Sequence, residues 1–451
     1  MNNLKYLIVF FSFLLSITNL HSQDYKVEDV KTKDFGGVFE LESVGFAIVY
    51  AKSGSWMVEI IDKDLNLLAK NDLGVTKSLL NVVKVFSNES SFCVLVSTRV
   101  SQHTLLSFDN SGNRTGKIEI EKELLNIYPS EDGYFIVKSN GSSSKSTDIV
   151  SYADNKLVQK WEKEFSQKFM TPNIYYANLD QTSINDGNLM NNGSSTNGIL
   201  GWTTPNLNGT TKSISIVNSQ GQILLNTECQ ENEAYKFIHF DAEEITLQKI
   251  SFSGKGFKRK LDKSFITKYD LEGNLIEEID TKMLDENTFK RDFFFLQYQY
   301  VKNDFFQTIN SSYSTFEVQK LNLKTNEIQK FTAPRKKNKF QSSLSNSALG
   351  IAEQISLNQY SFIHNDMEKD EFIFGYLHYN QLGFQNSISI EFTSTSDVFS
   401  VAKTNQIDLG NLKSAIKVKW LDLFKINDTL ALLSYYNKKE KSIILNKIQY
   451  N

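Results

Sequence analysis

The sequence is poor in the residues that mark several common protein classes. Its 451 residues include only 4 prolines, 2 cysteines and 5 histidines, and the formal net charge is −3. Two cysteines exclude a small domain stapled by many disulfides, and the near-neutral charge argues against a nucleic-acid-binding domain. After the N-terminal region, no segment reaches the roughly 20 apolar residues that a membrane-spanning helix needs. What remains is a globular chain rich in Phe (33) and Tyr (19), residues that favour β-strands.

Motifs for catalysis, metal binding and phosphate binding are also missing. The chain has no Gly-x-Ser-x-Gly motif, and its closest histidines after the N-terminal region, His364 and His378, are fourteen residues apart. Residues 62–66 imitate the opening of a calcium loop, but Leu67 and Leu73 stand where Gly and Glu are required. Cys93 lies in an apolar run and is interpreted as a core residue. We therefore predict no cofactor and no metal, and the sequence names no catalytic residue.

The N-terminus has the pattern of an export signal. Lys5 precedes a nearly unbroken apolar stretch over residues 6–15, and Ser22 is a small residue at a suitable cleavage point. We predict a signal peptide over residues 1–22 and a mature protein over residues 23–451. The pattern is similar to signal peptides of Gram-negative bacteria, and no cysteine follows that would take a lipoprotein anchor. The expected location is the periplasm or the medium, with a retained anchor as the alternative.

One turn recurs along the chain between strand-like segments. It is rich in Asp, Asn and Gly, and its clearest copies are residues 62–66, 109–113, 218–222 and 270–274, with weaker copies at 154–156, 324–326 and 380–383. Asp or Asn at the first position bonds the backbone two residues on, and Gly accepts a positive φ. The steps between copies are 42 to 67 residues, which is the length of a four-stranded propeller blade with insertions.

Alternating and apolar segments flank these turns. Residues 56–61 and 264–269 alternate before a turn, and the richer runs at 46–50, 92–96 and 134–137 are interpreted as inner strands buried on both faces. Helical periodicity is nearly absent apart from residues 284–291.

These repeats predict an all-β fold, a single β-propeller of about eight four-stranded blades, with seven as the alternative. The last pair of strands, at 430–436 and 442–448, leaves no chain for an outer strand. We expect residues 25–31 to supply that strand and close the ring, because an open sheet edge invites aggregation.

The repeated Asp-x-x-Gly-Asn turn between alternating strands resembles the exported bacterial β-propeller proteins of the quinoprotein-like and WD40-like repeat superfamilies. The resemblance implies a propeller over the whole mature chain and implies no particular activity. Quinoprotein dehydrogenases are rich in tryptophan and carry a vicinal cysteine pair. This chain has only 4 tryptophans and no such pair, so their cofactor is not carried over.

Basic residues gather in three loops that a propeller would place at one end of the ring. They are Lys255, Lys258, Arg259 and Lys260 in a hairpin of blade five, Arg335, Lys336 and Lys337 in the link to blade seven, and Lys438 and Lys439 in a hairpin of blade eight. The hypothesis is a face for an anionic partner, and the alternative is solvated lysine on unrelated loops.

The function predicted from these features is an exported, non-catalytic scaffold that binds an envelope protein or an anionic glycan. The alternative is a propeller hydrolase or lyase that acts on polysaccharide or peptide at the central channel. The sequence does not predict the oligomeric state.

Overall fold

A computed structural model describes most of residues 25–449. The segments outside the described residues are 78–81, 100–101, 140–147, 166–192, 197, 206–210, 241–243, 255–259, 271, 282–296, 303, 312–314, 335–361, 367–370, 383–384, 397–400, 409–417 and 428, together with both chain ends. The predicted signal peptide and the helical candidate at 284–291 therefore lie outside the described residues. Among those that are described, no helix is long and apolar enough to cross a membrane.

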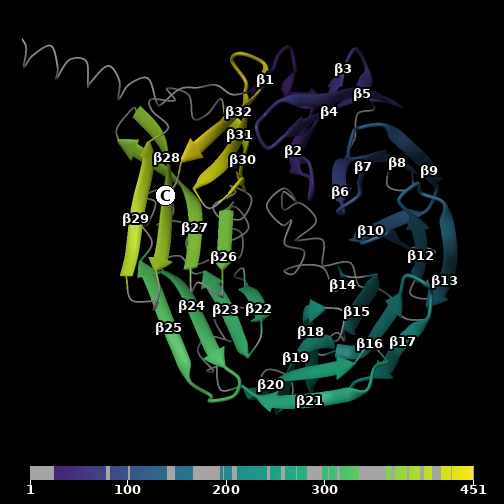
Figure 1. Cartoon of the computed structure of the whole chain (residues 1–451), viewed down its shortest axis with the longest axis vertical. Helices are drawn as coiled ribbons and strands as arrows, with labels where there is room; N and C mark the ends of the chain where they lie inside the picture. Colours follow the sequence, from purple (N-terminus) through teal and green to yellow (C-terminus); the bar gives the residue numbers. More distant parts are fainter. Residues whose placement is uncertain are drawn as a thin grey trace, which may run out of the picture.

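The described residues form eight antiparallel sheets of four strands, arranged around a common centre (Figure 1). We number the sheets in chain order. Sheets one to four are β2 (Phe35–Glu40), β3 (Gly45–Lys52), β4 (Ser55–Asp62) and β5 (Leu67–Thr76); β6 (Val82–Ser87), β7 (Ser91–Arg99), β8 (Gln102–Asp109) and β9 (Arg114–Ile120); β10 (Glu123–Ser130), β11 (Gly133–Ser139), β12 (Asp148–Asp154) and β13 (Gln159–Phe165); and β14 (Gly193–Thr196), β15 (Ile199–Pro205), β16 (Thr211–Asn218) and β17 (Ile223–Glu228).

Sheets five to eight continue the same order. They are β18 (Glu233–Phe240), β19 (Glu244–Ser253), β20 (Lys260–Asp270) and β21 (Leu275–Asp280); β22 (Gln297–Lys302), β23 (Phe305–Ser311), β24 (Thr315–Asn322) and β25 (Ile328–Pro334); β26 (Phe362–Asp366), β27 (Glu371–Leu382), β28 (Gln385–Ser396) and β29 (Val401–Asp408); and β30 (Val418–Lys425), β31 (Leu430–Asn437), β32 (Ser442–Gln449) and β1 (Tyr25–Val27). A short 3-10 helix, η1 (Thr32–Asp34), connects β1 to β2. The all-β propeller prediction is confirmed with eight sheets in the described residues.

The N-terminal strand completes the sheet built from the C-terminal strands. β1 pairs antiparallel with β32, with Tyr25 opposite Leu445 and Val27 opposite Ile443. The prediction that residues 25–31 supply the missing outer strand is therefore confirmed, and the first three of those residues form it. The described residues form eight four-stranded sheets, where the alternative had seven.

The recurring turn joins the third and fourth strands in sheets one to six. The weak copy predicted at 380–383 is wrong, because residues 380–382 end β27, the second strand of sheet seven. In sheet two, the Asp109 carboxylate accepts hydrogen bonds from the backbone N–H groups of Ser111 and Asn113, at 3.0 and 2.8 Å. Gly112 has φ +83°, a conformation that favours glycine. The calcium-like residues 62–66 adopt the same arrangement, with Asp62 accepting from the N–H groups of Asp64 and Asn66. They form a hairpin turn, as expected.

One interpretation of the strands was wrong. The apolar runs at 46–50, 92–96 and 134–137 are the second strands of their sheets, β3, β7 and β11, and a further strand lies inside each of them. Those first strands have mixed side chains, for example Glu–Leu–Leu–Asn–Ile–Tyr in β10. A strand that faces the centre of the ring on one edge does not need to be apolar throughout, so its pattern is weak.

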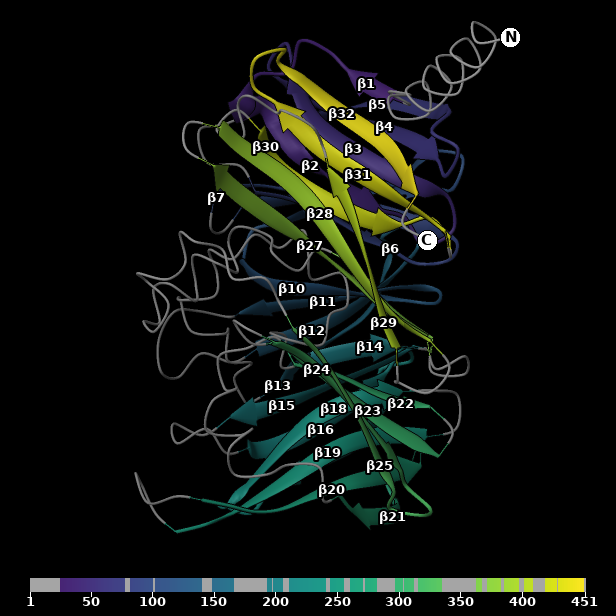
Figure 2. The same cartoon turned by 90° about the vertical axis from the view of Figure 1, so that its left-hand side faces the viewer.

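The core lies between neighbouring sheets. Phe92 and Phe108 of sheet two stack at 5.1 Å, in a cluster that also contains Val49 and Trp56 of sheet one. Cys93 is fully buried, which confirms its assignment to the core, and both cysteines are free. The strands run from one end of the ring to the other (Figure 2), so each sheet presents its loops at two opposite ends.

Candidate functional site

The antiparallel order of each sheet divides the loops between two ends. One end carries the hairpins between second and third strands and the links between sheets, and we call it the link end. Backbone hydrogen bonds join these two kinds of loop: Lys77 N–H to Gly54 O at 2.9 Å, Cys229 N–H to Lys212 O at 2.8 Å, and Val30 N–H to Lys441 O at 2.8 Å. The other end, with the recurring turns and the first hairpins, is the turn end.

The basic residues predicted from the sequence belong to the link end, but few of them are described. Lys438 and Lys439 are exposed in the hairpin between β31 and β32. Lys260 is the first residue of β20. Lys255, Lys258, Arg259, Arg335, Lys336 and Lys337 lie outside the described residues, so the predicted face as a whole stays a prediction.

Two further lysines join this end at the junction of sheets eight and one. Lys31 and Lys33 are exposed in the link from β1 to β2, and the hydrogen bond from Val30 N–H to Lys441 O holds that link against the β31–β32 hairpin. We call the five exposed lysines of these two loops the seam patch: Lys31, Lys33, Lys438, Lys439 and Lys441. The sequence analysis did not include Lys31 and Lys33 among the basic residues of this end. The assignment of residues 25–31 to a closing strand could have indicated them, because such a strand requires a link after it at the same end.

Carboxylates near the seam patch have lysine partners of their own. Glu440 lies 3.2 Å from Lys26 Nζ, and Asp34 binds Lys77. Neither Lys26 nor Lys77 belongs to the seam patch. The positive charge of the five exposed lysines is therefore only partly offset by nearby acids.

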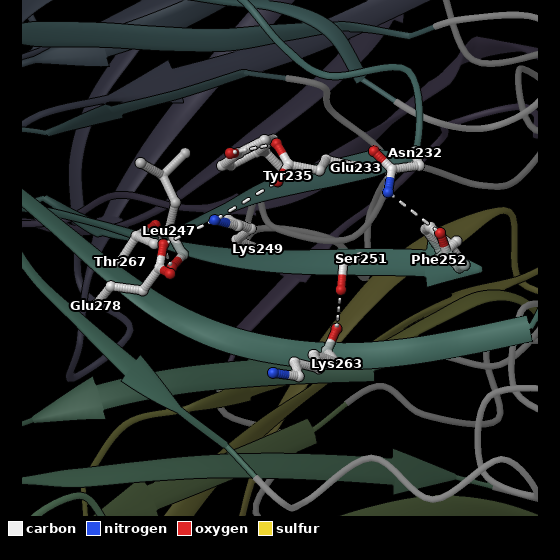
Figure 3. Close-up of polar contacts among 10 residues, drawn as sticks. All are labelled: Asn232, Glu233, Tyr235, Leu247, Lys249, Ser251, Phe252, Lys263, Thr267 and Glu278. Atoms are coloured by element: carbon white, nitrogen blue, oxygen red, sulfur yellow. Dashed lines mark hydrogen bonds and ion pairs between the residues drawn. The ribbon is translucent and has the colours of Figure 1, made fainter.

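Sheet five contains a polar cluster built by residues of β18, β19 and β21 (Figure 3). Lys249 of β19 has its Nζ 2.8 Å from Glu278 Oε2 of β21 and 3.6 Å from Glu233 Oε1 of β18. Tyr235 of β18 donates its hydroxyl to Glu233 Oε2 at 2.9 Å. Tyr235 stands opposite Lys249 in the strand register, so the alternation of β-strands puts these side chains on one face.

The same region fixes the base of the β19–β20 hairpin, whose loop carries Lys255, Lys258 and Arg259. Asn232 donates its Nδ2 to the carbonyl of Phe252 at 3.3 Å, and Ser251 donates its hydroxyl to the carbonyl of Lys263 at 3.4 Å (Figure 3). These hydrogen bonds connect the link between sheets four and five to β19, and β19 to β20. The described ends of the two hairpin strands are therefore fixed by hydrogen bonds at the link end.

The electrostatics of this cluster suit a structural role. Burial opposes the charge on Lys249, but the carboxylates of Glu278 and Glu233 outweigh it and raise the lysine pKa. Burial and the hydrogen bond to Glu233 raise the pKa of Tyr235, and burial with the Glu233 charge raises the pKa of Cys229 to about 12. At neutral pH the cluster therefore holds a charged lysine, a neutral tyrosine and a protonated thiol. None of these is an activated base or nucleophile.

A serine–histidine pair in sheet two does not form a nucleophile. Ser97 Oγ lies 2.7 Å from His103 Nδ1, which has the spacing of an activated serine. However, the backbone N–H of Leu124 donates to His103 Nε2 at 3.4 Å, so Nε2 is the acceptor nitrogen and the neutral ring carries its proton on Nδ1. The histidine then donates to the serine instead of deprotonating it. Within the described residues, no group of three or more metal-binding side chains comes together.

Carboxylates from different sheets approach one another at the turn end. Glu42 lies in the first hairpin of sheet one and Glu89 in that of sheet two, and the hydroxyl of Ser43 donates to the backbone carbonyl of Glu89 at 2.6 Å. Partial burial and the Glu89 charge raise the pKa of Glu42. Both side chains are exposed, so no enclosed acid–base pair forms at this place.

Comparison with known proteins gives only distant similarities. No family model matches the chain, and no curated protein matches it. Among solved structures it is similar to the Dos1 propeller (8% identity, TM-score 0.46, 93% of each chain covered). It is also similar to the WD40 domain of SCAP from fission yeast (8%, 0.34, 94% and 98%) and to polysaccharide lyase Uly1 (9%, 0.38, 82% and 92%). Identities this low concern the fold alone, and propellers serve many unrelated functions.

Proposed function

We propose that the protein is an exported, non-catalytic scaffold that binds an anionic partner, an envelope protein or an acidic glycan, through the link end of the propeller. The observation that carries the proposal is the seam patch. There the chain brings five exposed lysines together from two loops more than 400 residues apart in sequence, Lys31 and Lys33 on one side and Lys438, Lys439 and Lys441 on the other. Export is proposed from the N-terminal pattern.

The physical basis is electrostatic. Exposed lysines on rigidly held loops raise the local concentration of an anion and speed its association, although each surface contact contributes little. The loops are held by Val30 N–H to Lys441 O and by the hydroxyl of Tyr436, which donates to Val30 O at 2.7 Å. The basic loop of blade five belongs to the same end, in another sector of the ring, so a long polyanion is the partner that uses both.

The test is salt-dependent retention on immobilised heparin, a generic anionic glycan. Wild-type protein should elute at clearly higher salt than the variant Lys31→Ser/Lys438→Ser/Lys439→Ser. The matched control removes three exposed lysines from the turn end, Lys63→Ser/Lys156→Ser/Lys324→Ser, and should elute close to wild type. Equal elution of both variants would reject the link end as the binding surface.

A further inference from the structure

The outer strand of sheet five is built differently from its counterparts. In the part of the chain that the structure describes, β21 pairs with β20 alone, and its other edge has no strand partner. Unpaired edges template the addition of another strand, and natural proteins protect them with lysine, proline or covering loops. The outer strands therefore show how each edge of this propeller is protected.

Most described outer strands carry lysine. Exposed lysines stand in β5, β9, β13 and β25; these are Lys70, Lys117, Lys160, Lys163 and Lys330. β17 has no lysine, but the turn of the next sheet covers it, since a Cβ on Gly273 would come within 2.7 Å of the carbonyl oxygen of Leu224. β21, with the sequence Leu–Ile–Glu–Glu–Ile–Asp, has neither lysine nor arginine.

The side chains of β21 are apolar and acidic, and they are open to solvent. Leu275 and Ile276 are each 57% exposed, more than any other large hydrophobic residue of the described structure. Glu277 and Asp280 are exposed as well. Glu278 is already bound by Lys249, and Lys268, the cross-strand neighbour of Glu277, has its Nζ 3.1 Å from Glu244. The negative charge of this edge is thus left facing outward.

We propose that the free edge of β21 is a docking site for an extended segment of a partner protein that carries apolar residues at one end and mainly basic residues along the rest. Backbone hydrogen bonds to the edge would extend sheet five by a strand of about six residues, or about 20 Å. The apolar end of the segment covers Leu275 and Ile276 at the start of β21, and its lysines or arginines further along meet Glu277 on one face of the strand and Asp280 on the other. This site is separate from the seam patch and does not depend on the function proposed above.

The probe is a fluorescein-labelled peptide, Lys-Val-Lys-Lys-Val-Val, whose apolar end lies opposite Leu275 and Ile276 in an antiparallel pairing, with its binding followed by fluorescence anisotropy. We expect it to bind wild-type protein and to bind the Leu275→Lys/Ile276→Lys variant at least tenfold more weakly. The matched control is Leu67→Lys/Leu68→Lys, which changes the same two positions of β5, where the exposed fractions are 50% and 47%. The control variant should bind as wild type does.

Two further peptides separate strand addition from simple charge attraction. A version with alternate backbone amides N-methylated keeps its charge but loses half of its donors, and it should not bind. A version with Glu in place of Lys should not bind either. If the double variant fails to fold, as judged by circular dichroism, Glu277→Lys replaces it, and we expect its affinity to fall at least threefold.

The proposal is overturned if the lysine peptide does not bind wild-type protein, or if the N-methylated peptide binds equally well. It is also overturned if the β5 control loses as much affinity as the β21 variant. The seam-patch variant should bind the peptide as tightly as wild type does. A loss of affinity in that variant would mean that the peptide binds at the seam patch and not at β21, and would overturn the proposal.

Discussion

Two clusters of the same residue types, a carboxylate, a tyrosine and a lysine, have different roles in this propeller. At the junction of sheets one and eight, Glu59 accepts hydrogen bonds from Tyr25 at 2.8 Å, from Tyr50 at 2.6 Å and from Lys70 at 2.6 Å. In sheet five, Lys249 is shared between Glu233 and Glu278. The Glu59 side chain is 4% exposed, whereas that of Glu278 is 33% exposed.

The connection between sheets differs as well. Tyr25 belongs to β1, the strand that completes sheet eight, and Glu59 belongs to β4 of sheet one, so the first cluster joins the two chain ends. Glu233, Tyr235, Lys249 and Glu278 all belong to sheet five. The comparison teaches that burial and position, rather than residue type, decide whether such a cluster holds the ring together.

Removing the buried carboxylate should have the largest effect. Glu59→Ala leaves two tyrosine hydroxyls and a lysine without their shared acceptor, and loss of one partner from a buried charged network costs about 3 kcal/mol of unfolding free energy. Urea unfolding followed by tryptophan fluorescence measures it. Glu59→Gln keeps the shape but removes the charge and should lose less; unchanged stability of this variant would mean that the charge contributes nothing.

Acid should weaken the junction of sheets one and eight through Glu59. Burial opposes ionisation of Glu59, but the hydrogen bonds from Lys70, Tyr50 and Tyr25 outweigh it and hold its pKa below the ordinary value of 4.5. A carboxyl whose folded pKa is depressed stabilises the fold above the unfolded pKa, and that contribution is lost as the pH falls through the folded pKa. Wild-type stability should therefore drop below about pH 4.5. The Glu59→Gln variant should show a smaller drop, and identical pH profiles would contradict the assignment.

Alkali should act on the same junction through tyrosine. Burial and the hydrogen bond to Glu59 raise the pKa of Tyr50 to about 12, against an ordinary value of 10.0. Because the folded state keeps the neutral phenol, its contribution is complete below pH 10.0 and is lost as the pH rises towards 12. Tyr50→Phe should flatten the stability profile between these pH values, as measured by urea unfolding at each pH.

Single hydroxyl removal should have an intermediate effect. Tyr25→Phe deletes one of three donors to Glu59 and should cost about 1 kcal/mol. Since the change affects the strand that completes sheet eight, hydrogen exchange should increase in β32 more than in β20. A uniform increase across the chain would argue against a role at the junction.

The smallest effect is expected in sheet five. Glu278→Ala leaves Lys249 with Glu233 at 3.6 Å, and because Glu278 is 33% exposed its loss should cost about 0.5 kcal/mol. A loss as large as that of Glu59→Ala would remove the distinction between the clusters.

The sequence predicted the features that depend on local chemistry. The recurring turns follow from Asp or Asn at the first position and Gly or Asn later, and the count of eight sheets follows from the eight pairs of strand-like segments along the chain. Even the pairing of β1 with β32 was predicted, because the strand count left sheet eight one strand short. The first strands were missed because their alternation is irregular, as in β10.

Side-chain clusters could not be predicted in the same way. Tyr25 and Glu59 are 34 residues apart and belong to different sheets, so their contact depends on how sheets one and eight pack. The neighbourhood of Lys31 and Lys441 depends on the same packing. Lys249 with Glu233 was missed for a related reason: the register of sheet five, which no local pattern reveals, puts their side chains on one face.

The central claim is that the N-terminal strand completes the last sheet in one register. Lys26 stands opposite Ile444 in that register, so the Lys26→Cys/Ile444→Cys variant should form an intramolecular disulfide under mild oxidation. Lys26→Cys/Ile448→Cys moves one cysteine four residues along β32 and should not form it. Mass spectrometry of proteolytic fragments identifies the cross-link. No cross-link in the first variant, or equal cross-linking in both, would contradict the claim.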